Sequence, residues 1–236
     1  MVQPLYIQIM QDIQRKIIGG DFKVDEQIPS EQELLSEYGV SRVTLRKSID
    51  GLVMDGYLER IQGKGTFVKK RRKLNRLVES KRVEGFSDVA KKGGFVPSTK
   101  VIEATTISSN EKLSEKLGLS DEETKVVYIK RIRLADNVPI MIENNYFSFD
   151  KYSGLLEDNL ELPLYEILKN KYHEENFDSP DSTLGVTLAN TEQSKYLDCS
   201  VGFPLFELKT LITNKKGVPI HYGEHYIVSD RYQFKI

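Results

Sequence analysis

The chain of 236 residues has almost no cysteine, and the single Cys199 excludes an intrachain disulfide and a cysteine zinc cluster. Long hydrophobic runs are also missing, since no apolar stretch approaches the roughly 18 residues that span a bilayer. Residues 1–4 lack the basic-then-apolar pattern of an export signal. These absences predict a cytoplasmic protein with no membrane segment, in which Cys199 is a small buried apolar residue rather than a reactive thiol.

Net charge is nearly absent too, but the charges are distributed unevenly. The formal net charge is −1, whereas residues 41–73 carry ten lysines and arginines against three acidic residues, a local charge of +7. The remainder of the chain is therefore at −8. This polarity suits a chain that touches a polyanion with one end. A merely solvated basic face gives the same count, so the motifs must decide.

The first forty residues contain the pattern of two short helices. Apolar residues recur every four positions over residues 5–17, which predicts an amphipathic helix that ends at the glycine pair 19–20. Ser30 and Glu33 have the spacing of a capping box, in which each side chain binds a free backbone N–H at a helix start. Gly39 is placed to end that second helix in a left-handed turn.

A third helix is predicted from residue 42 to about 55, with Ser41 as its N-cap. At 100° per residue, one side of this helix buries Leu45, Ile49 and Leu52. The exposed side carries Val43, Thr44, Arg46 and Lys47, with Arg42 in the first turn. Two short helices joined by a glycine-containing turn form a helix-turn-helix, whose second helix can enter the major groove of DNA.

Residues 57–68 predict a β-hairpin, with strands at 57–61 and 66–68 joined by the turn 62–65. Two glycines flank Lys64 and let the tip of the hairpin approach a phosphate backbone closely. The hairpin is interpreted as the wing of a winged helix-turn-helix.

Four motifs of this segment resemble the DNA-binding domain of the GntR family of transcription regulators. They are Pro4-Leu5-Tyr6, Pro29-Ser30-Glu31-x-Glu33-Leu34, Val40-Ser41-Arg42-x-Thr44-Leu45-Arg46 and Gly63-Lys64-Gly65-Thr66-Phe67-Val68. Together with the exposed helix face, the resemblance implies DNA contacts by Gln32, Ser41, Arg42, Thr44, Arg46, Lys47, Lys64 and Gly65. Arg42 and Arg46 are the expected base-reading pair, because a guanidinium group can donate two hydrogen bonds to one guanine. Two questions stay open: whether they are ordinary surface arginines, and whether Val43 touches a thymine methyl.

The predicted domains are a DNA-binding domain at 1–70, a linker at 71–80 and a second domain at 81–236. The basic run 69–73 is interpreted either as a solvated hinge or as a flank of the DNA surface that adds salt-dependent affinity.

From about residue 80 the pattern changes to long strands with a few helices. The predicted strands are 97–105, 124–135, 138–149, 180–188, 203–214 and 218–228, and the predicted helices are 110–117, 163–171 and 191–197. Segments 131–140 and 209–220 resemble each other, since each leads through a polar turn to Val-Pro-Ile. This repetition predicts a duplicated antiparallel sheet with helices on one face, an α+β architecture.

Short motifs in this second half resemble the effector-binding UTRA domain of the HutC-type branch of the same family, which has a chorismate-lyase-like fold. They are Gly85-Phe86-Ser87, Arg131-x-Arg133-Leu134, Pro139-x-x-x-Glu143, Pro163-Leu164-Tyr165 and Asp230-Arg231-Tyr232-x-Phe234. The resemblance implies that Phe86 and Ser87 hold an anion such as phosphate. Arg131 and Arg133 would join them, since alternate residues of a strand share one face. The resemblance places Glu143 and Tyr165 against the rest of the ligand.

Two features depart from the family pattern. His221 stands where relatives carry a glutamate, and residues 227–229 read Ile-Val-Ser where a Tyr-Arg-Gly is usual. Both lie where a sugar would be recognised, so an anion is expected and no particular sugar is identified. His221 is interpreted either as a ligand contact or as a residue of the sheet, and His173 and His225 as surface or structural residues. The two pocket arginines could instead pair with acidic neighbours across the sheet.

These patterns predict a homodimeric repressor that binds double-stranded operator DNA under the control of a small anionic effector, such as a sugar phosphate. The dimer would form mainly through the second domain. No metal or cofactor is expected, because three histidines and one cysteine form no recognisable set. An enzyme with a lyase-like domain is the first alternative, but no nucleophile-and-base pair is evident. An effector-independent DNA binder is the second, which the arginine and Glu143 motifs oppose.

Overall fold

The computed structural model describes residues 4–69, 73–77, 83–120 and 125–235. The chain divides into two compact units, and the main boundary lies between residues 72 and 73. Within the described ranges, no helix is both long and apolar enough to cross a membrane.

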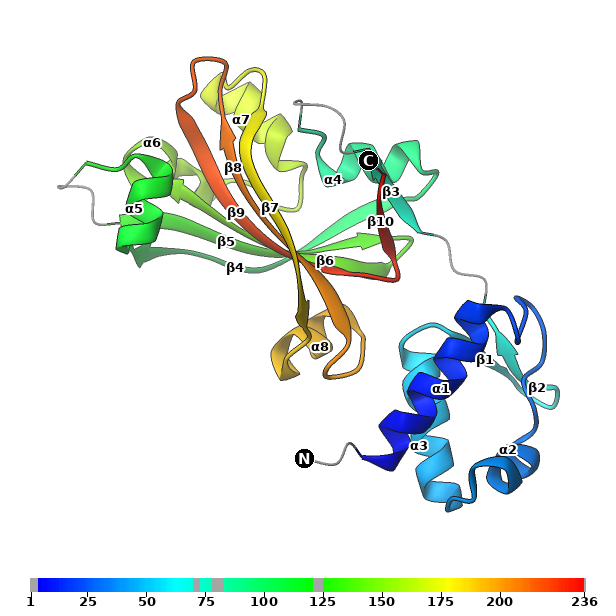
Figure 1. Cartoon of the computed structure of the whole chain (residues 1–236). Coiled ribbons are helices and arrows are strands. Elements are labelled where there is room, and N and C mark those ends of the chain that lie inside the picture. The colour runs from blue at the N-terminus through cyan, green and yellow to red at the C-terminus, as the bar shows by residue number, and fades with distance from the viewer. Residues whose placement is uncertain (1–3, 70–72, 78–82, 121–124, 236) are drawn as a thin grey trace. The chain divides into compact units, whose positions relative to one another are not determined.

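The described part of the first unit contains three helices and a hairpin, coloured blue to cyan in Figure 1. Its elements are α1 (Leu5–Gly19), α2 (Glu31–Tyr38), α3 (Arg42–Met54), β1 (Leu58–Ile61) and β2 (Gly65–Val68). The capping box is present: Ser30 Oγ accepts from the Glu33 backbone N–H, and Glu33 Oε2 accepts from the Ser30 backbone N–H at 2.7 Å. Gly39 ends α2 with a φ of 63°. The predicted helix-turn-helix is therefore confirmed.

The wing is held close to the loop that precedes α2. β1 and β2 pair in antiparallel register, and Gln27 forms an isolated bridge with Phe67. Gly65 has a φ of 125°, and a Cβ atom there would overlap the side-chain amide of Gln27. Only glycine fits at such a close approach, which explains one of the two glycines of the turn.

The second unit is built on a six-stranded antiparallel sheet of order β4-β5-β6-β9-β8-β7 (Figure 1). The strands are β4 (Pro97–Ser108), β5 (Lys125–Ala135), β6 (Val138–Ser148), β7 (Asp178–Leu188), β8 (Pro204–Thr213) and β9 (Pro219–Val228). The hairpins β5–β6 and β8–β9 meet at the centre, and β4 and β7 form the two edges. This symmetrical order accords with the internal repeat, and all six predicted strands are confirmed.

Helices cover both faces of this sheet, so the prediction of helices on one face is wrong. The helices are α4 (Phe86–Lys92), α5 (Glu111–Leu117), α6 (Phe149–Tyr152), the 3-10 helix η1 (Ser153–Glu157), α7 (Leu164–Tyr172) and α8 (Thr191–Leu197). α6, η1 and α7 pack on the face of Val127 and Ile129, whereas α5 packs against Val126 and Tyr222 on the opposite face. Neighbouring strand residues point to opposite faces, so a strand covered on both sides shows no clear alternation.

β3 (Leu74–Leu77) and β10 (Tyr232–Lys235) form a separate parallel pair. Residues 74–77 therefore belong to the second unit, and the predicted linker at 71–80 is wrong for these four positions. Leu74 is fully buried among side chains of α4 and β10. A strand this short, paired with the far end of the chain, gives no periodic signal in the sequence. Positions 71–72 and 78–80 lie outside the described residues.

Candidate DNA interface and effector pocket

α3 presents side chains that were predicted to contact DNA. Arg42 and Arg46 are exposed, and Val43 has 79% of its surface accessible. Ser41 caps the helix by accepting a hydrogen bond from the Thr44 backbone N–H at 3.2 Å, and the two hydroxyl oxygens lie 2.9 Å apart. The first turn of α3 thus presents hydroxyl and guanidinium groups side by side.

Two cations of α3 have partners inside the first unit. Arg46 Nε lies 3.2 Å from Glu31 Oε2, at the start of α2, and Lys47 Nζ lies 3.9 Å from the centroid of the Tyr6 ring. Exposed ion pairs contribute only about 0–1 kcal/mol to stability. A pair of this strength is easily exchanged for a contact with DNA, so Glu31 orients Arg46 without sequestering it.

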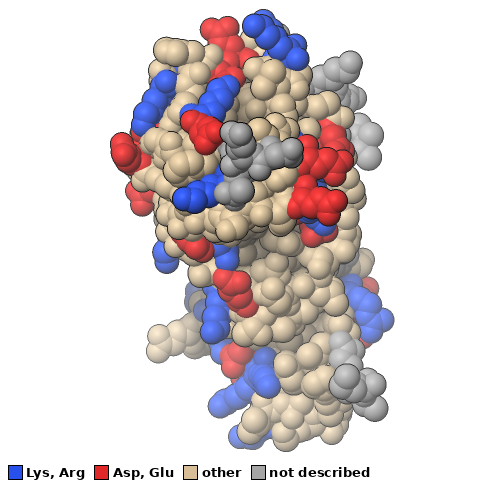
Figure 2. Space-filling model, turned by 90° about the vertical axis from the view of Figure 1, so that its left-hand side faces the viewer, with Lys and Arg blue, Asp and Glu red and all other residues tan. Residues whose placement is uncertain are grey.

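The remaining residues predicted to contact DNA, Gln32 of α2 and Lys64 and Gly65 of the wing, are exposed as well. On the face shown in Figure 2, basic and acidic side chains are interspersed and neither sign forms a continuous patch. The positive surplus of residues 41–73 is thus a local feature. Residues 70–72 of the basic run lie outside the described residues.

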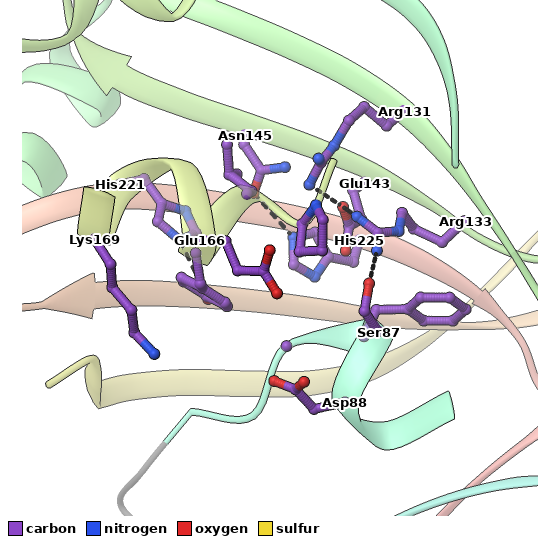
Figure 3. A pocket seen from close by; sticks show the side chains of 15 residues that line it. Ser87, Asp88, Arg131, Arg133, Glu143, Asn145, Glu166, Lys169, His221 and His225 are labelled. Carbon is purple, nitrogen blue, oxygen red and sulfur yellow. Dashed lines mark hydrogen bonds and ion pairs between the residues drawn. The ribbon is translucent and has the colours of Figure 1, made fainter. Parts of the chain in front are cut away.

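A cavity of about 650 Å³, including its open mouth, lies in the second unit. All seven residues predicted for effector binding line it: Phe86, Ser87, Arg131, Arg133, Glu143, Tyr165 and His221. In Figure 3, side chains of β5, β6 and β9 face those of α4 and α7 across the cavity. The structure thus brings together residues that are up to 135 positions apart in the sequence, from Phe86 to His221.

Arg131 and Glu143 form a buried ion pair in this cavity. They lie opposite each other on β5 and β6, with Arg131 Nη2 2.7 Å from Glu143 Oε2. Arg131 Nη1 also donates to the backbone carbonyl groups of Leu160, at 3.2 Å, and Leu162, at 3.4 Å. The alternative that the sequence left open, pairing with an acidic neighbour across the sheet, is therefore confirmed for Arg131.

Arg133 has a different environment. Its Nη2 donates to Ser87 Oγ at 2.8 Å, and its guanidinium carbon lies 4.9 Å from the centroid of the Phe86 ring. Its Nη1 is 3.6 Å from Glu143 Oε2, beyond hydrogen-bond distance. Because Ser87 accepts from Arg133, its own hydroxyl hydrogen can be donated to another group. Ser87 and Arg133 together can therefore offer donors to an anion.

The buried charges of the cavity carry an excess of one positive charge, because Arg131 and Arg133 face a single Glu143. Burial raises the pKa of Glu143, but Arg133 and Arg131 outweigh burial and hold that pKa at about 2. Glu143 is thus ionised at neutral pH, and one anionic group would balance the remaining charge.

Two further residues of the cavity, His225 and Asn145, were not identified from the sequence. His225 was interpreted as a surface or structural residue, whereas the structure places it in the cavity wall, with Nε2 3.4 Å from Asn145 Oδ1. His225 shares a strand face with His221, four residues away on β9, and Asn145 shares one with Glu143 on β6. That even spacing is the signal that could have revealed both.

The exposed rim of the cavity is also charged, through Asp88, Glu166 and Lys169. Asp88 and Glu166 lie in the first turns of α4 and α7, where an acidic side chain complements the helix dipole. That role explains both carboxylates without a ligand contact.

His221 leads to an expected pH effect on stability. Burial lowers the pKa of its imidazole from 6.5 to about 3, and the side chain is only 2% exposed. An imidazole that is neutral when folded but protonated when unfolded loses stability as the pH falls below about 6.5. Between pH 7 and pH 5 we expect the unchanged protein to lose about 1–2 kcal/mol more than His221→Gln. Urea denaturation at both pH values measures this, and equal losses would contradict a buried neutral imidazole.

Comparison with known proteins matches both units. Residues 5–68 match the gntR family of bacterial regulatory proteins, and residues 92–233 match the UTRA domain. The HTH-type transcriptional regulator YurK of Bacillus subtilis (strain 168) is 34% identical over 99% of this chain and 95% of its own. The mannosyl-D-glycerate transport/metabolism system repressor MngR of Escherichia coli (strain K12) is 25% identical, over 99% and 95%. PhnF from Mycobacterium smegmatis, 21% identical, shares the fold with a TM-score of 0.64 over 96% of each chain.

The winged unit and the cavity-bearing unit thus define a DNA-binding transcription regulator, not an enzyme. More specifically, the chain belongs to the GntR family, in the branch that carries a UTRA domain. The predicted fold class, a winged helix-turn-helix followed by an antiparallel UTRA sheet with helices, is confirmed.

Proposed function

We propose that this protein is a repressor whose operator affinity is set by a small anionic metabolite bound in the cavity of the UTRA unit. The observation that carries the proposal is the pairing of Arg133 with Ser87 at 2.8 Å beside an excess buried positive charge. The cavity volume of about 650 Å³ is in the range of small-molecule sites. An effector-independent DNA binder would leave this arrangement without a use.

In this proposal α3 enters the major groove of the operator and the wing approaches the phosphate backbone. The contacts come from Gln32, Ser41, Arg42, Thr44, Arg46, Lys47, Lys64 and Gly65. The exposure of these positions supports the assignment.

The anionic group of the effector lies between Ser87 and Arg133. The other contacts come from Phe86, Arg131, Glu143, Tyr165 and His221. A sugar phosphate has the required charge and size, and the relative MngR, named for a mannosyl-D-glycerate system, supports a sugar-derived effector.

Effector binding reaches the DNA-binding unit through α4. This helix carries Ser87, and its residues Val89 and Ala90 are buried in one cluster with Leu74 of β3. β3 follows the chain segment that leaves the winged unit, so a displacement of α4 is passed to that segment. The effector then changes operator affinity by the ratio of its affinities for the two arrangements.

The protein acts in the cytoplasm as a homodimer, with the UTRA units in contact. The edge strand β7 exposes three apolar side chains at alternate positions: Leu184, Val186 and Leu188. Exposed apolar edge strands are sites of association. We expect sedimentation of the full chain, 27.1 kDa per protomer, to give about twice that mass. Val186→Glu should shift the mass toward one protomer, and a monomeric unchanged protein would contradict the dimer.

Titration of an operator complex with a panel of sugar phosphates tests the effector proposal. Fluorescence anisotropy of labelled DNA, selected by the protein from a random pool, should change with at least one compound. For that compound Ser87→Ala is expected to raise the half-effective concentration about tenfold, because a hydrogen bond to a charged group is lost. Ser98→Ala, at an exposed position of β4, serves as the control. Unchanged DNA binding across the panel would contradict the proposal.

A further inference from the structure

Some buried hydrogen-bond donors of the cavity have no partner. They are Nδ2 of Asn145 and Nε of Arg131 and Arg133, and each of these residues is at most 3% exposed. Buried polar groups in folded proteins are nearly always paired. Donors left over in a cavity therefore indicate the chemistry of what fills it.

The unpartnered atoms ask for acceptors. An amide Nδ2 and a guanidinium Nε can only donate, whereas Nδ1 of His221, also without a partner, donates or accepts according to its tautomer. Among the described residues that line the cavity, no buried side-chain oxygen lacks a partner. A ligand hydroxyl would bring a hydrogen that could go only to His221, whereas a carboxylate or carbonyl oxygen brings none.

These donors lie at two separate places. Arg133 is at the Ser87 end, whereas Asn145 lies opposite Ile129, four residues farther along β5. At about 3.3 Å per residue, the two places are about 13 Å apart along the strand. Figure 3 shows Asn145 and His221 on the other side of the cavity from Ser87. A single phosphate cannot reach both places.

We infer that the effector carries, besides its anionic group at Ser87 and Arg133, a second group at Asn145 with an acceptor oxygen that bears no hydrogen. The group is a carboxylate or a carbonyl, so the ligand class is a phosphorylated sugar acid or acylated sugar phosphate rather than a simple polyol phosphate. This inference rests on the proposed function and defines its ligand more narrowly.

Two matched pairs of compounds test the inference by calorimetric titration of the full chain. 6-Phosphogluconate and glucitol 6-phosphate differ by a carboxylate against a hydroxymethyl group, and N-acetylglucosamine 6-phosphate and glucosamine 6-phosphate by an acetyl carbonyl. In at least one pair, the acceptor-bearing compound should bind about tenfold tighter or more. Asn145→Leu should reduce that ratio to below about twofold. Asn144→Leu, on the opposite face of β6, should keep it.

Each other outcome has a defined meaning. Equal affinities within both pairs, with measurable binding, would overturn the inference and leave the anionic effector in place. A preference that survives in Asn145→Leu, with the melting temperature confirming a folded protein, would overturn the role of Asn145. No binding of any of the four compounds or of inorganic phosphate would overturn both the inference and the proposed anion site.

Discussion

Replacement of Arg131 by methionine is expected to lower the free energy of unfolding by about 3–5 kcal/mol, because it leaves a buried carboxylate without its main partner. Arg131 Nη2 lies 2.7 Å from Glu143, whereas Arg133 Nη1 is 3.6 Å away and cannot take its place. The carbonyl groups of Leu160 and Leu162 lose their donor in the same step. Urea denaturation at neutral pH, where Glu143 is ionised, measures the loss.

Two companion variants show whether the loss comes from the unpaired charge. Arg131→Met combined with Glu143→Leu removes both charges, and we expect it to recover at least about half of the lost stability. Arg60→Met breaks an exposed pair with Asp50, 2.5 Å long, and should cost less than about 1 kcal/mol. A double variant as unstable as the sum of the two single changes would show that Arg131 and Glu143 are not coupled.

The different roles of Arg131 and Arg133 could not be predicted from the sequence. Two residues apart on one strand, they share a face and look equivalent. The difference comes from the strand register, which sets Arg131 opposite Glu143 and Arg133 opposite Met141. Register depends on how β5 and β6 pair over their whole length, which motif spacing does not specify.

Elements with a local signal were predicted well. The capping box at Ser30 and Glu33, the glycine at 39 and the repeated Val-Pro-Ile turns are all properties of neighbouring residues, and the structure has the expected elements there. β3 and β10 were missed because four-residue strands from opposite ends of the unit depend only on tertiary pairing. α4 was missed as a helix, since seven residues cover barely two turns.

The cavity was predicted in the same uneven way. Its seven expected residues came from short motifs that a family resemblance gathers into one site, and the structure places them around one cavity. Asn145 and His225 belong to no such motif and reach the cavity only through the pleat of β6 and β9. Their contribution depends on which strand face is covered by α4 and α7, and a strand buried on both faces conceals that choice.

The base-reading role of α3 leads to the largest expected effect on DNA binding. Arg42→Ala and Arg46→Ala should each weaken binding to the selected operator by about 10- to 100-fold, since a guanidinium contact to a base edge is worth about 1–3 kcal/mol. Affinity for unrelated DNA should fall much less. Arg15→Ala, an exposed arginine of α1 paired with Asp12 at 2.8 Å, is the matched control and should bind the operator normally.

The salt dependence of operator binding separates a base contact from a phosphate contact. Loss of a phosphate contact, expected for Lys64→Ala in the wing, lowers the slope of log affinity against log salt by about 1. Loss of a base contact by Arg42 or Arg46 should leave that slope nearly unchanged while relaxing sequence preference. Glu31→Gln should leave that preference intact, because an exposed pair at 3.2 Å only orients Arg46. If the double alanine variant still preferred the operator, sequence would be read elsewhere than on α3.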